Sequence, residues 1–399
     1  MPGRSRTVPL VLFCLICLLT APVSSAQVTS WELAWPMVGH DPQRTNRTTA
    51  TVASHPRLVF SVPGVSEQPI VGPDGAVYSW TNNGLAAVAP SGTTAWTYRA
   101  WPAEGGPPVL APDGTVYVNG LTGSEIVLPN AAIIGVGPHG RLASKLQPAG
   151  FSKGSPPAET RTGDLYLPYV GPTEQNSGLV VMLHGKRAPV LQPGFAFQSM
   201  AVGQNGSVYA VGRYSSHDDG LSIERLTPGG TVLWRHALRY DGGSVMVGLH
   251  GHVYVASGVA VGTGSAPYTQ LSSYTAHGRL DWRHRPALGT AVLAQRADGV
   301  ILAAGQGELA AYAASGAPIW RLRVRVSTLD AVPSIAVDAT NTAFVGSGDG
   351  HVSVVSANGI LEETLVGGPT STTSAPQVAI GAEGRLIVVG TDSILRVYQ

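Results

Sequence analysis

Residues 69–96 read PIVGPDGAVYSWTNNGLAAVAPSGTTAW, and this stretch decides the fold. An Asp-Gly pair (Asp74-Gly75) and an Asn-Gly pair (Asn83-Gly84) separate short runs that are rich in β-branched and aromatic residues. Such pairs suit the positive φ angles of tight hairpin turns. A third turn is indicated by Gly92, which Trp96 follows four residues later. The stretch therefore predicts one antiparallel unit of four short strands.

The same unit returns along the chain. A turn residue precedes a Val-Tyr-like pair at eight places: Gly75, Gly114, Gly163, Gly206, Gly251, Gly299, Asn341 and Gly384. The spacing averages about 44 residues, the length of a four-stranded propeller blade. No stretch has the apolar spacing of a helix. We predict an all-β, eight-bladed β-propeller, with seven blades as the alternative because the unit around Gly163 is the poorest copy.

A Gly-x-x-x-Trp pattern occurs four times, at Gly92–Trp96, Gly230–Trp234, Gly278–Trp282 and Gly316–Trp320. Each glycine can adopt the positive φ that a tight turn needs. An indole four residues later can lie between neighbouring blades and bury about 150–250 Å². Because ligand-binding residues need not repeat with the blade, these tryptophans are predicted to dock blades together.

The two ends of the propeller complement each other. The eighth unit stops at Leu395–Tyr398, one strand short, and Arg57–Val62 has the composition of an isolated strand. Pairing these segments would close the ring and remove exposed sheet edges. We therefore predict ring closure by the N-terminal strand.

Residues 1–26 have the pattern of a secretory signal peptide. Arg4 and Arg6 precede an apolar run from Val8 to Ala21, and small residues lead to a predicted cleavage after Ala26. An uncleaved anchor is the alternative, although the run is short for a bilayer span of about 20 residues. Cleavage would leave residues 27–56 as an extended leader and residues 57–399 as the propeller.

Cleavage would also remove both cysteines, Cys14 and Cys17, and with them any disulfide or thiolate site. The mature chain would hold 23 basic and 24 acidic residues. This balance indicates neither a nucleic-acid footprint nor an anionic membrane surface. We expect a monomer in the periplasm or outside the cell, without a transmembrane segment.

Two stretches carry a family resemblance. Ala336–Glu362 reads AVDATNTAFVGSGDGHVSVVSANGILE, and Trp35–Thr45 reads WPMVGHDPQRT. They resemble the repeat and the leader of propellers with pyrroloquinoline-quinone-type (PQQ-like) repeats, and the resemblance runs from Trp35 to Gln399. Such repeats occur in enzymes and in non-catalytic proteins alike.

The catalytic branch of this resemblance is the quinoprotein alcohol dehydrogenases. These hold the quinone with a calcium ion on the propeller axis, above a vicinal disulfide and near an axial Asp base. The mature chain has no cysteine, and no Glu/Asn/Asp set matches residue by residue. The other branch is non-catalytic and includes the BamB-type assembly-factor lipoprotein. The chain resembles that branch in length, leader and repeat number, but it lacks the lipid-attachment cysteine motif.

Few residues indicate chemistry. On a strand, His250 and His252 would face one side, but metal binding needs a third ligand and no acidic residue is near in sequence. The pair occupies the position where other units have an Asp-Gly or Asn-Gly turn, so we expect a turn there. The segment Ser215–Asp219 gathers a hydroxyl, an imidazole and two carboxylates, and we expect a solvated insertion there. The remaining candidates are turn histidines His139 and His277, the strand arginines Arg321, Arg323 and Arg325, and the glycosylation-pattern asparagines Asn46 and Asn205.

These observations predict a secreted or periplasmic binding or scaffold module for a protein or glycan partner. No catalytic residue, metal or cofactor is predicted, and PQQ with calcium is not expected. Two enzymatic alternatives stay open. One is a PQQ-dependent dehydrogenase, and the other is a carbohydrate-active enzyme with two axial carboxylates about 5–10 Å apart.

Overall fold

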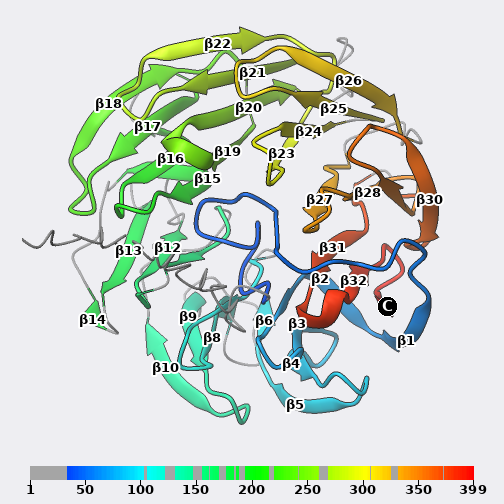
Figure 1. Ribbon diagram of the computed structural model, residues 1–399. Coiled ribbons are helices and arrows are strands. Elements are labelled where there is room, and N and C mark those ends of the chain that lie inside the picture. Colours follow the sequence, from blue (N-terminus) through cyan, green and yellow to red (C-terminus); the bar gives the residue numbers. More distant parts are fainter. Residues whose placement is uncertain are drawn as a thin grey trace, which may run out of the picture.

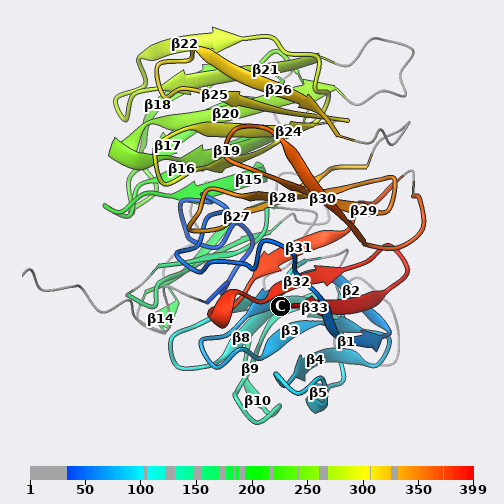
Figure 2. The ribbon, with the colours of Figure 1, turned by 45° about the vertical axis from the view of Figure 1, so that its right-hand side comes forward.

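Eight small antiparallel sheets stand around one axis in the computed structural model (Figure 1; Figure 2). The structure describes residues 34–102, 106–121, 131–146, 155–160, 162–169, 177–183, 186–187, 194–214, 220–240, 242–259, 268–305, 307–324, 331–371 and 373–399. Within these ranges the helical turns are the three-residue 3₁₀ segments η3 (Leu249–Gly251) and η4 (Ala382–Gly384). No helix in these ranges has the length and apolarity that crossing a bilayer requires.

Blades 1 to 4 follow in chain order, innermost strand first. Blade 1 comprises β2 (Val65–Val71), β3 (Val77–Thr81), β4 (Gly84–Val88) and β5 (Thr94–Tyr98), and blade 2 comprises β6 (Trp101–Pro102), β7 (Val109–Leu110), β8 (Val116–Leu121), β9 (Ala131–Val136) and β10 (Leu142–Leu146). Blade 3 comprises β11 (Ala158–Glu159), β12 (Leu165–Tyr169), β13 (Gly178–Leu183) and β14 (Lys186–Arg187). Blade 4 comprises β15 (Phe195–Val202), β16 (Val208–Tyr214), β17 (Ser222–Leu226) and β18 (Val232–Ala237).

Blades 5 to 8 repeat the arrangement. Blade 5 comprises β19 (Gly243–Val247), β20 (Val253–Val259), β21 (Tyr268–Tyr274) and β22 (Leu280–His284), and blade 6 comprises β23 (Val292–Gln295), β24 (Ile301–Gly305), β25 (Glu308–Tyr312) and β26 (Pro318–Arg323). Blade 7 comprises β27 (Ser334–Val337), β28 (Ala343–Ser347), β29 (His351–Val355) and β30 (Leu361–Val366). Blade 8 comprises β31 (Gln377–Ile380), β32 (Leu386–Val389), β33 (Ile394–Tyr398) and β1 (Leu58–Pro63).

The predicted number of eight blades is confirmed, and the seven-bladed alternative is wrong. The unit around Gly163 forms blade 3, a sheet of four strands in the order β11-β12-β13-β14. Its sequence is a poor copy because β11 and β14 are two residues long, so the unit shows little strand-like pattern.

Ring closure by the N-terminal strand is also confirmed. β1 pairs antiparallel with β33, with Leu58 opposite Tyr398 and Pro63 opposite Ile394. Backbone bonds between Arg57 and Gln399 extend this pairing in both directions, at 2.8 and 2.9 Å. Figure 1 shows the C-terminus beside β1.

The hydrophobic core is divided among the spaces between blades. One buried cluster joins Trp80 and Leu85 of blade 1 to Val118 and Ile134 of blade 2, and others join blades 4 with 5, 5 with 6, and 6 with 7. Inner and middle strands are buried on both faces; β4, for example, is buried throughout. This is why they read as continuous apolar runs in the sequence.

The turns have the conformation that the repeat pattern indicates. The six predicted turn glycines have φ between 70° and 85°: Gly75, Gly114, Gly206, Gly251, Gly299 and Gly384. Blade 7 has Asn341 at this position with φ 66°, and its side-chain Oδ1 accepts a bond from the Ala297 backbone N–H at 2.8 Å. Asparagine tolerates this region better than most residues, which explains the exception.

The glycine and tryptophan of the Gly-x-x-x-Trp pattern meet across blade boundaries. A β-carbon added to Gly278 would lie 2.7 Å from Cγ of Trp234, and one added to Gly316 would lie 2.7 Å from Cγ of Trp282. Trp96 packs on Gly140 and Trp320 on Gly359 in the same way. Each indole thus lies on the turn glycine of the following blade.

The closing blade uses a smaller ring for the same contact. Phe60 of β1 lies against Gly92, where an added β-carbon would be 2.8 Å from the Phe60 ring. Three indole N–H groups also bond to a backbone carbonyl of the next blade, from Trp234 to Ala276, Trp282 to Ala314 and Trp320 to Ala357, at 2.9–3.2 Å.

Candidate functional site

The leader lies across one end of the ring axis, where it accepts backbone hydrogen bonds from the innermost strands of the blades. Backbone N–H groups donate to it from Val71, Leu110, Val202, Val247, Gln295 and Val337, and their acceptors are the carbonyls of Trp35, Pro36, Pro42, Gln43, Thr45 and Asn46 in that order. The distances are 2.7–2.9 Å. In Figure 1 the leader is the blue loop at the centre of the ring. It therefore acts as a floor that ties six blades together.

Arg44 fixes the leader to blades 3 and 4. Its Nε donates to the Met200 carbonyl at 3.0 Å, and its Nη2 donates to the Pro156 and Pro157 carbonyls at 2.6 and 2.8 Å. Nη1 donates to the Val38 carbonyl within the leader. Burial lowers the pKa of the guanidinium to about 10, so it stays charged at neutral pH. Four carbonyl acceptors hold this cation in place.

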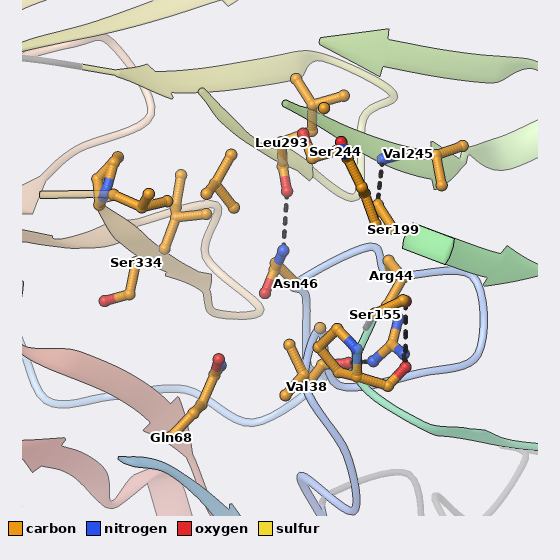
Figure 3. Close-up of a pocket in the computed structure, with 18 of the residues that line it drawn as sticks. Val38, Arg44, Asn46, Gln68, Ser155, Ser199, Ser244, Val245, Leu293 and Ser334 are labelled. Atoms are coloured by element: carbon orange, nitrogen blue, oxygen red, sulfur yellow. Dashed lines mark hydrogen bonds between the residues drawn. The ribbon is translucent and has the colours of Figure 1, made fainter. Parts of the chain in front are cut away.

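A cavity of about 310 Å³ lies on the axis directly above this floor (Figure 3). Seven of the eight innermost strands contribute an equivalent position, three residues before the last residue of the strand. These residues line the cavity and are Gln68, Pro156, Ser199, Ser244, Val292, Ser334 and Gln377. Seven blades therefore converge on one central pocket, whereas the equivalent residue of blade 2, Pro107, lines an adjoining cavity.

Apart from Arg44, the polar side chains of the central pocket are neutral, and most of those with a hydrogen bond are bonded to the backbone. Ser244 donates to the Ala291 carbonyl at 2.8 Å, Ser334 donates to the Pro376 carbonyl at 2.6 Å, and Ser199 Oγ accepts from the Val245 N–H at 3.1 Å. Asn46 Nδ2 donates to the Leu293 carbonyl at 2.8 Å, a bond drawn in Figure 3. These bonds fix the direction of each hydroxyl and amide before any partner arrives.

Gln198 is the exception in this lining. Its side-chain Oε1 is buried, and among the described residues it has no hydrogen-bond partner. A buried acceptor without a donor costs roughly 1–3 kcal/mol. Such an oxygen can be satisfied by an ordered water or by a donor of a bound partner.

A second cavity of about 410 Å³ adjoins the central pocket and shares Gln68, Pro156 and Gln377 with it. Glu67 lies in its wall with a left-handed φ of 67°, and burial raises the pKa of its carboxyl. The described lining of the central pocket itself contains no Asp, Glu or His.

A third cavity, of about 480 Å³, lies on the other side of the leader and includes His40, Asp41 and Arg47. Burial opposes ionisation of Asp41, but the neighbouring His40 ring and hydrogen bonds from Thr45 outweigh it and leave the pKa of the carboxyl below its ordinary value. His40 Nδ1 is 3.6 Å from Asp41 Oδ2, and its ring meets Trp35 edge-on at 5.0 Å. Leader side chains thus alternate between the central pocket and this cavity.

The predicted histidine pair does not share a strand face. His250 lies in η3 with φ 65°, and His252 Nδ1 is 3.0 Å from Asp281 Oδ2 on β22. His250 thus occupies the turn position expected from the repeat, and the acid beside His252 comes from a neighbouring strand that is distant in sequence. No group of three or more His, Asp or Glu in the described ranges is arranged to hold a metal.

Of the other candidates in the described ranges, Asn46 lines the central pocket and the rest lie outside its lining. Asn46 is buried and bonded, so it is no glycosylation acceptor in the folded protein, whereas Asn205 is an exposed turn residue. Arg321 and Arg323 are exposed on β26, and His139 and His277 precede the positive-φ turn glycines Gly140 and Gly278. The segment Ser215–Asp219, Arg325 and the predicted signal peptide lie outside the described residues.

Sequence reasoning missed the lining of the central pocket. Gln68, Gln198 and Gln377 stand among apolar strand residues and belong to no motif. A signal was present, since the repeat places an equivalent residue three positions before the end of each innermost strand. Polar residues at that position in several blades would have indicated a polar axis.

No protein-family profile matches the chain, and no curated protein matches its sequence. Solved structures do match. BamB from Moraxella catarrhalis aligns with a TM-score of 0.61 at 15% identity, over 86% of this chain and 100% of that chain. The quinohemoprotein alcohol dehydrogenase from Comamonas testosteroni has a TM-score of 0.63 at 14% identity, over 93% and 81% of the two chains. A europium-containing methanol dehydrogenase has a TM-score of 0.63 at 12% identity, over 90% and 89%.

The fold and the site define an eight-bladed β-propeller whose axis is floored by its own leader. It shares this fold with BamB and with the two alcohol dehydrogenases named above. Identities of 12–15% establish the shared fold and not the activity.

Proposed function

We propose that the protein is a binding module of the periplasm or the cell exterior, and that its central pocket receives a neutral polar segment of a partner. The observation that carries this proposal is the buried, unpartnered Oε1 of Gln198 in a pocket with fixed neutral side chains. The signal-like residues 1–26 support placement outside the cytoplasm.

The lining favours binding over catalysis. General acid–base and nucleophilic catalysis need a titratable group beside the reacting atoms. The described lining offers hydroxyls bonded to backbone groups, amides, and the Arg44 cation already held by four carbonyls. Glu67 in the adjoining cavity is a single carboxylate, whereas glycoside hydrolysis commonly uses two.

PQQ with calcium fits this donor set poorly. Calcium prefers several oxygen ligands that include carboxylates, and the described lining of the central pocket has none. The quinone itself carries carboxylates, but the one lining cation is already bonded. We expect no dye reduction with alcohols or sugars after PQQ and calcium are added. Turnover by folded protein would show that the pocket does hold the quinone.

A protein segment is a better candidate than a glycan. Sugar rings commonly stack on aromatic faces, and the described lining contains no aromatic ring. It combines amides from Gln68, Gln198 and Gln377 with apolar Val, Leu, Ile and Pro side chains. Side-chain amides match the donor and acceptor pair of a peptide group.

Affinity capture with Gln198→Leu tests the proposal. The change removes the unpartnered oxygen, so stability should be kept or rise by about 1 kcal/mol, while partner recovery from the envelope or culture fraction is lost. Gln204→Leu, an exposed turn residue outside this pocket, is the matched control and should keep recovery. Equal recovery by wild type and Gln198→Leu would show that the central pocket is not the binding site.

A further inference from the structure

Arginine is concentrated on the outer edge of three consecutive blades. Seven exposed arginines lie on or beside β18, β22 and β26, the outermost strands of blades 4, 5 and 6: Arg235, Arg239, Arg279, Arg283, Arg285, Arg321 and Arg323. We call this set the arginine arc. These strands are neighbours along the rim of the ring in Figure 1. A formal net charge of +1 for the whole chain conceals this asymmetry.

Three members of the arc have acidic partners. Arg235 Nε is 2.5 Å from Oε1 of the fully buried Glu224, Arg279 is 3.2 Å from Asp281, and Arg321 is 3.6 Å from Glu308. The side chains of Arg279 and Arg321 are still 79% and 53% exposed. Their guanidinium groups therefore keep donors available to solvent.

The other four members lack such partners. Within the described part of the chain, no carboxylate lies within 4.0 Å of Arg239, Arg283, Arg285 or Arg323. Arg283 Nε reaches the Ser272 hydroxyl at 3.4 Å, and Arg239 lies over the Tyr240 ring at 5.7 Å. Within the described ranges these four cations therefore have no carboxylate at ion-pair distance, although Glu308 stands opposite Arg323 in the register of β25 and β26.

Basic residues are fewer on the other outermost strands. β30 carries Glu362 and Glu363, β10 carries Lys145, β14 carries Lys186 and Arg187, and β1 and β5 carry no charged residue but are each flanked by one arginine. All seven members of the arc are arginine, as are 22 of the 25 basic residues of the chain. The planar guanidinium group presents paired donors that match the oxygens of a phosphate, and arginine is favoured where such recognition occurs.

We propose that the arginine arc binds an extended polyanion that carries phosphate groups. A flexible polymer can follow the convex rim over three blades and pair with successive guanidinium groups. Exposed aliphatic residues do not favour a bilayer instead, because they lie on outermost strands all round the ring, as Leu58, Leu142 and Ile319 show. The arc lies at the perimeter and the central pocket on the axis, so this site is independent of the proposed function.

Binding of poly(glycerol phosphate) to the whole protein tests the proposal. The arc variant Arg239→Gln/Arg283→Gln/Arg323→Gln removes one unpaired arginine from each blade. The control Arg57→Gln/Arg99→Gln/Arg141→Gln removes three exposed arginines outside the arc. Both variants change the net charge equally. Their melting temperatures, measured alongside, should stay close to that of wild type because all six side chains are exposed.

Titration at low salt should show affinity reduced roughly tenfold or more for the arc variant and less than about twofold for the control. The salt dependence should weaken in the arc variant because fewer counterions are released. Equal losses in both variants, or no binding by wild type, would overturn the proposal. It would also be overturned if phosphatidylglycerol vesicles bind with dependence on Val232 and Leu233 while the free polymer does not.

Discussion

Arg44 and Gln198 are both polar and line the same pocket, but the protein bonds them differently. Arg44 uses four of its five N–H groups on carbonyls of the leader and of blades 3 and 4. Gln198 keeps a buried oxygen without a donor. The first arrangement stabilises the fold, whereas the second costs stability and is retained where a ligand supplies the missing bond.

Replacing Arg44 with methionine should destabilise the protein by at least about 3 kcal/mol, because four buried carbonyls lose a charged donor. Urea unfolding followed by tryptophan fluorescence measures this. Arg47→Met is the control, since its one described bond is a 3.4 Å contact to the Arg296 carbonyl. Equal costs for the two variants would contradict the role of Arg44.

Glu159 predicts a pH dependence of stability. It is buried, and burial followed by the charges of Asp113 and Asp164 raises its pKa to about 9 from an ordinary value of 4.5. Between these values the folded state keeps a proton that the unfolded state loses, so stability falls as pH rises from about 4.5 to 9. The slope is at most about 1.4 kcal/mol per pH unit.

Glu159→Gln removes this titration. The melting temperature of the variant relative to wild type should therefore rise steadily from pH 5 to pH 9. A difference that stays constant over that range would show that Glu159 does not keep its proton in the folded state.

At the scale of strands and turns, the blade is a unit of four strands. An aromatic side chain of the preceding blade packs on one of its turns. The indole on an outermost strand covers the turn glycine of the next blade, and Phe60 does the same for the closing blade. The contact leaves no room for a β-carbon on the turn residue. The aromatic side chain can therefore pack there only when that residue is glycine.

The pair Trp282 and Gly316 should show this coupling. Trp282→Ala and Gly316→Ala should each cost about 1–3 kcal/mol, the second because of φ 91° and the close indole. The double variant should cost less than the sum by at least about 0.5 kcal/mol. Trp234→Ala with Gly316→Ala joins residues of non-adjacent blades and should be additive; coupling there would argue against pairwise docking.

The strand-level fold was largely predictable because its signals are local. Asp-Gly and Asn-Gly turns, β-branched runs and the missing last strand sufficed for eight blades and for closure by β1. The acidic partner of His252 was not predicted because Asp281 comes from another strand, which spacing within one segment does not show. The central pocket was missed because its residues meet only when the ring closes.

At the scale of the whole molecule, ring and leader form one structure with a polar axis. Six innermost strands bond to the leader, and the two ends of the propeller share one sheet. Because seven of the eight blades contribute residues to the pocket wall, the pocket forms only in the closed ring. This rigidity suits a module that binds a partner without rearrangement.

Site-specific photo-crosslinking tests the central claim most directly. Val332 lies at the rim of the central pocket and is 44% exposed, and Leu142 on β10 is 50% exposed and far from the axis. A benzophenone amino acid at position 332, irradiated in the native envelope or culture fraction, should give one discrete adduct that Gln198→Leu abolishes, while position 142 gives none. Adducts at position 142 and none at position 332, or adducts indifferent to Gln198→Leu, would contradict binding in the central pocket.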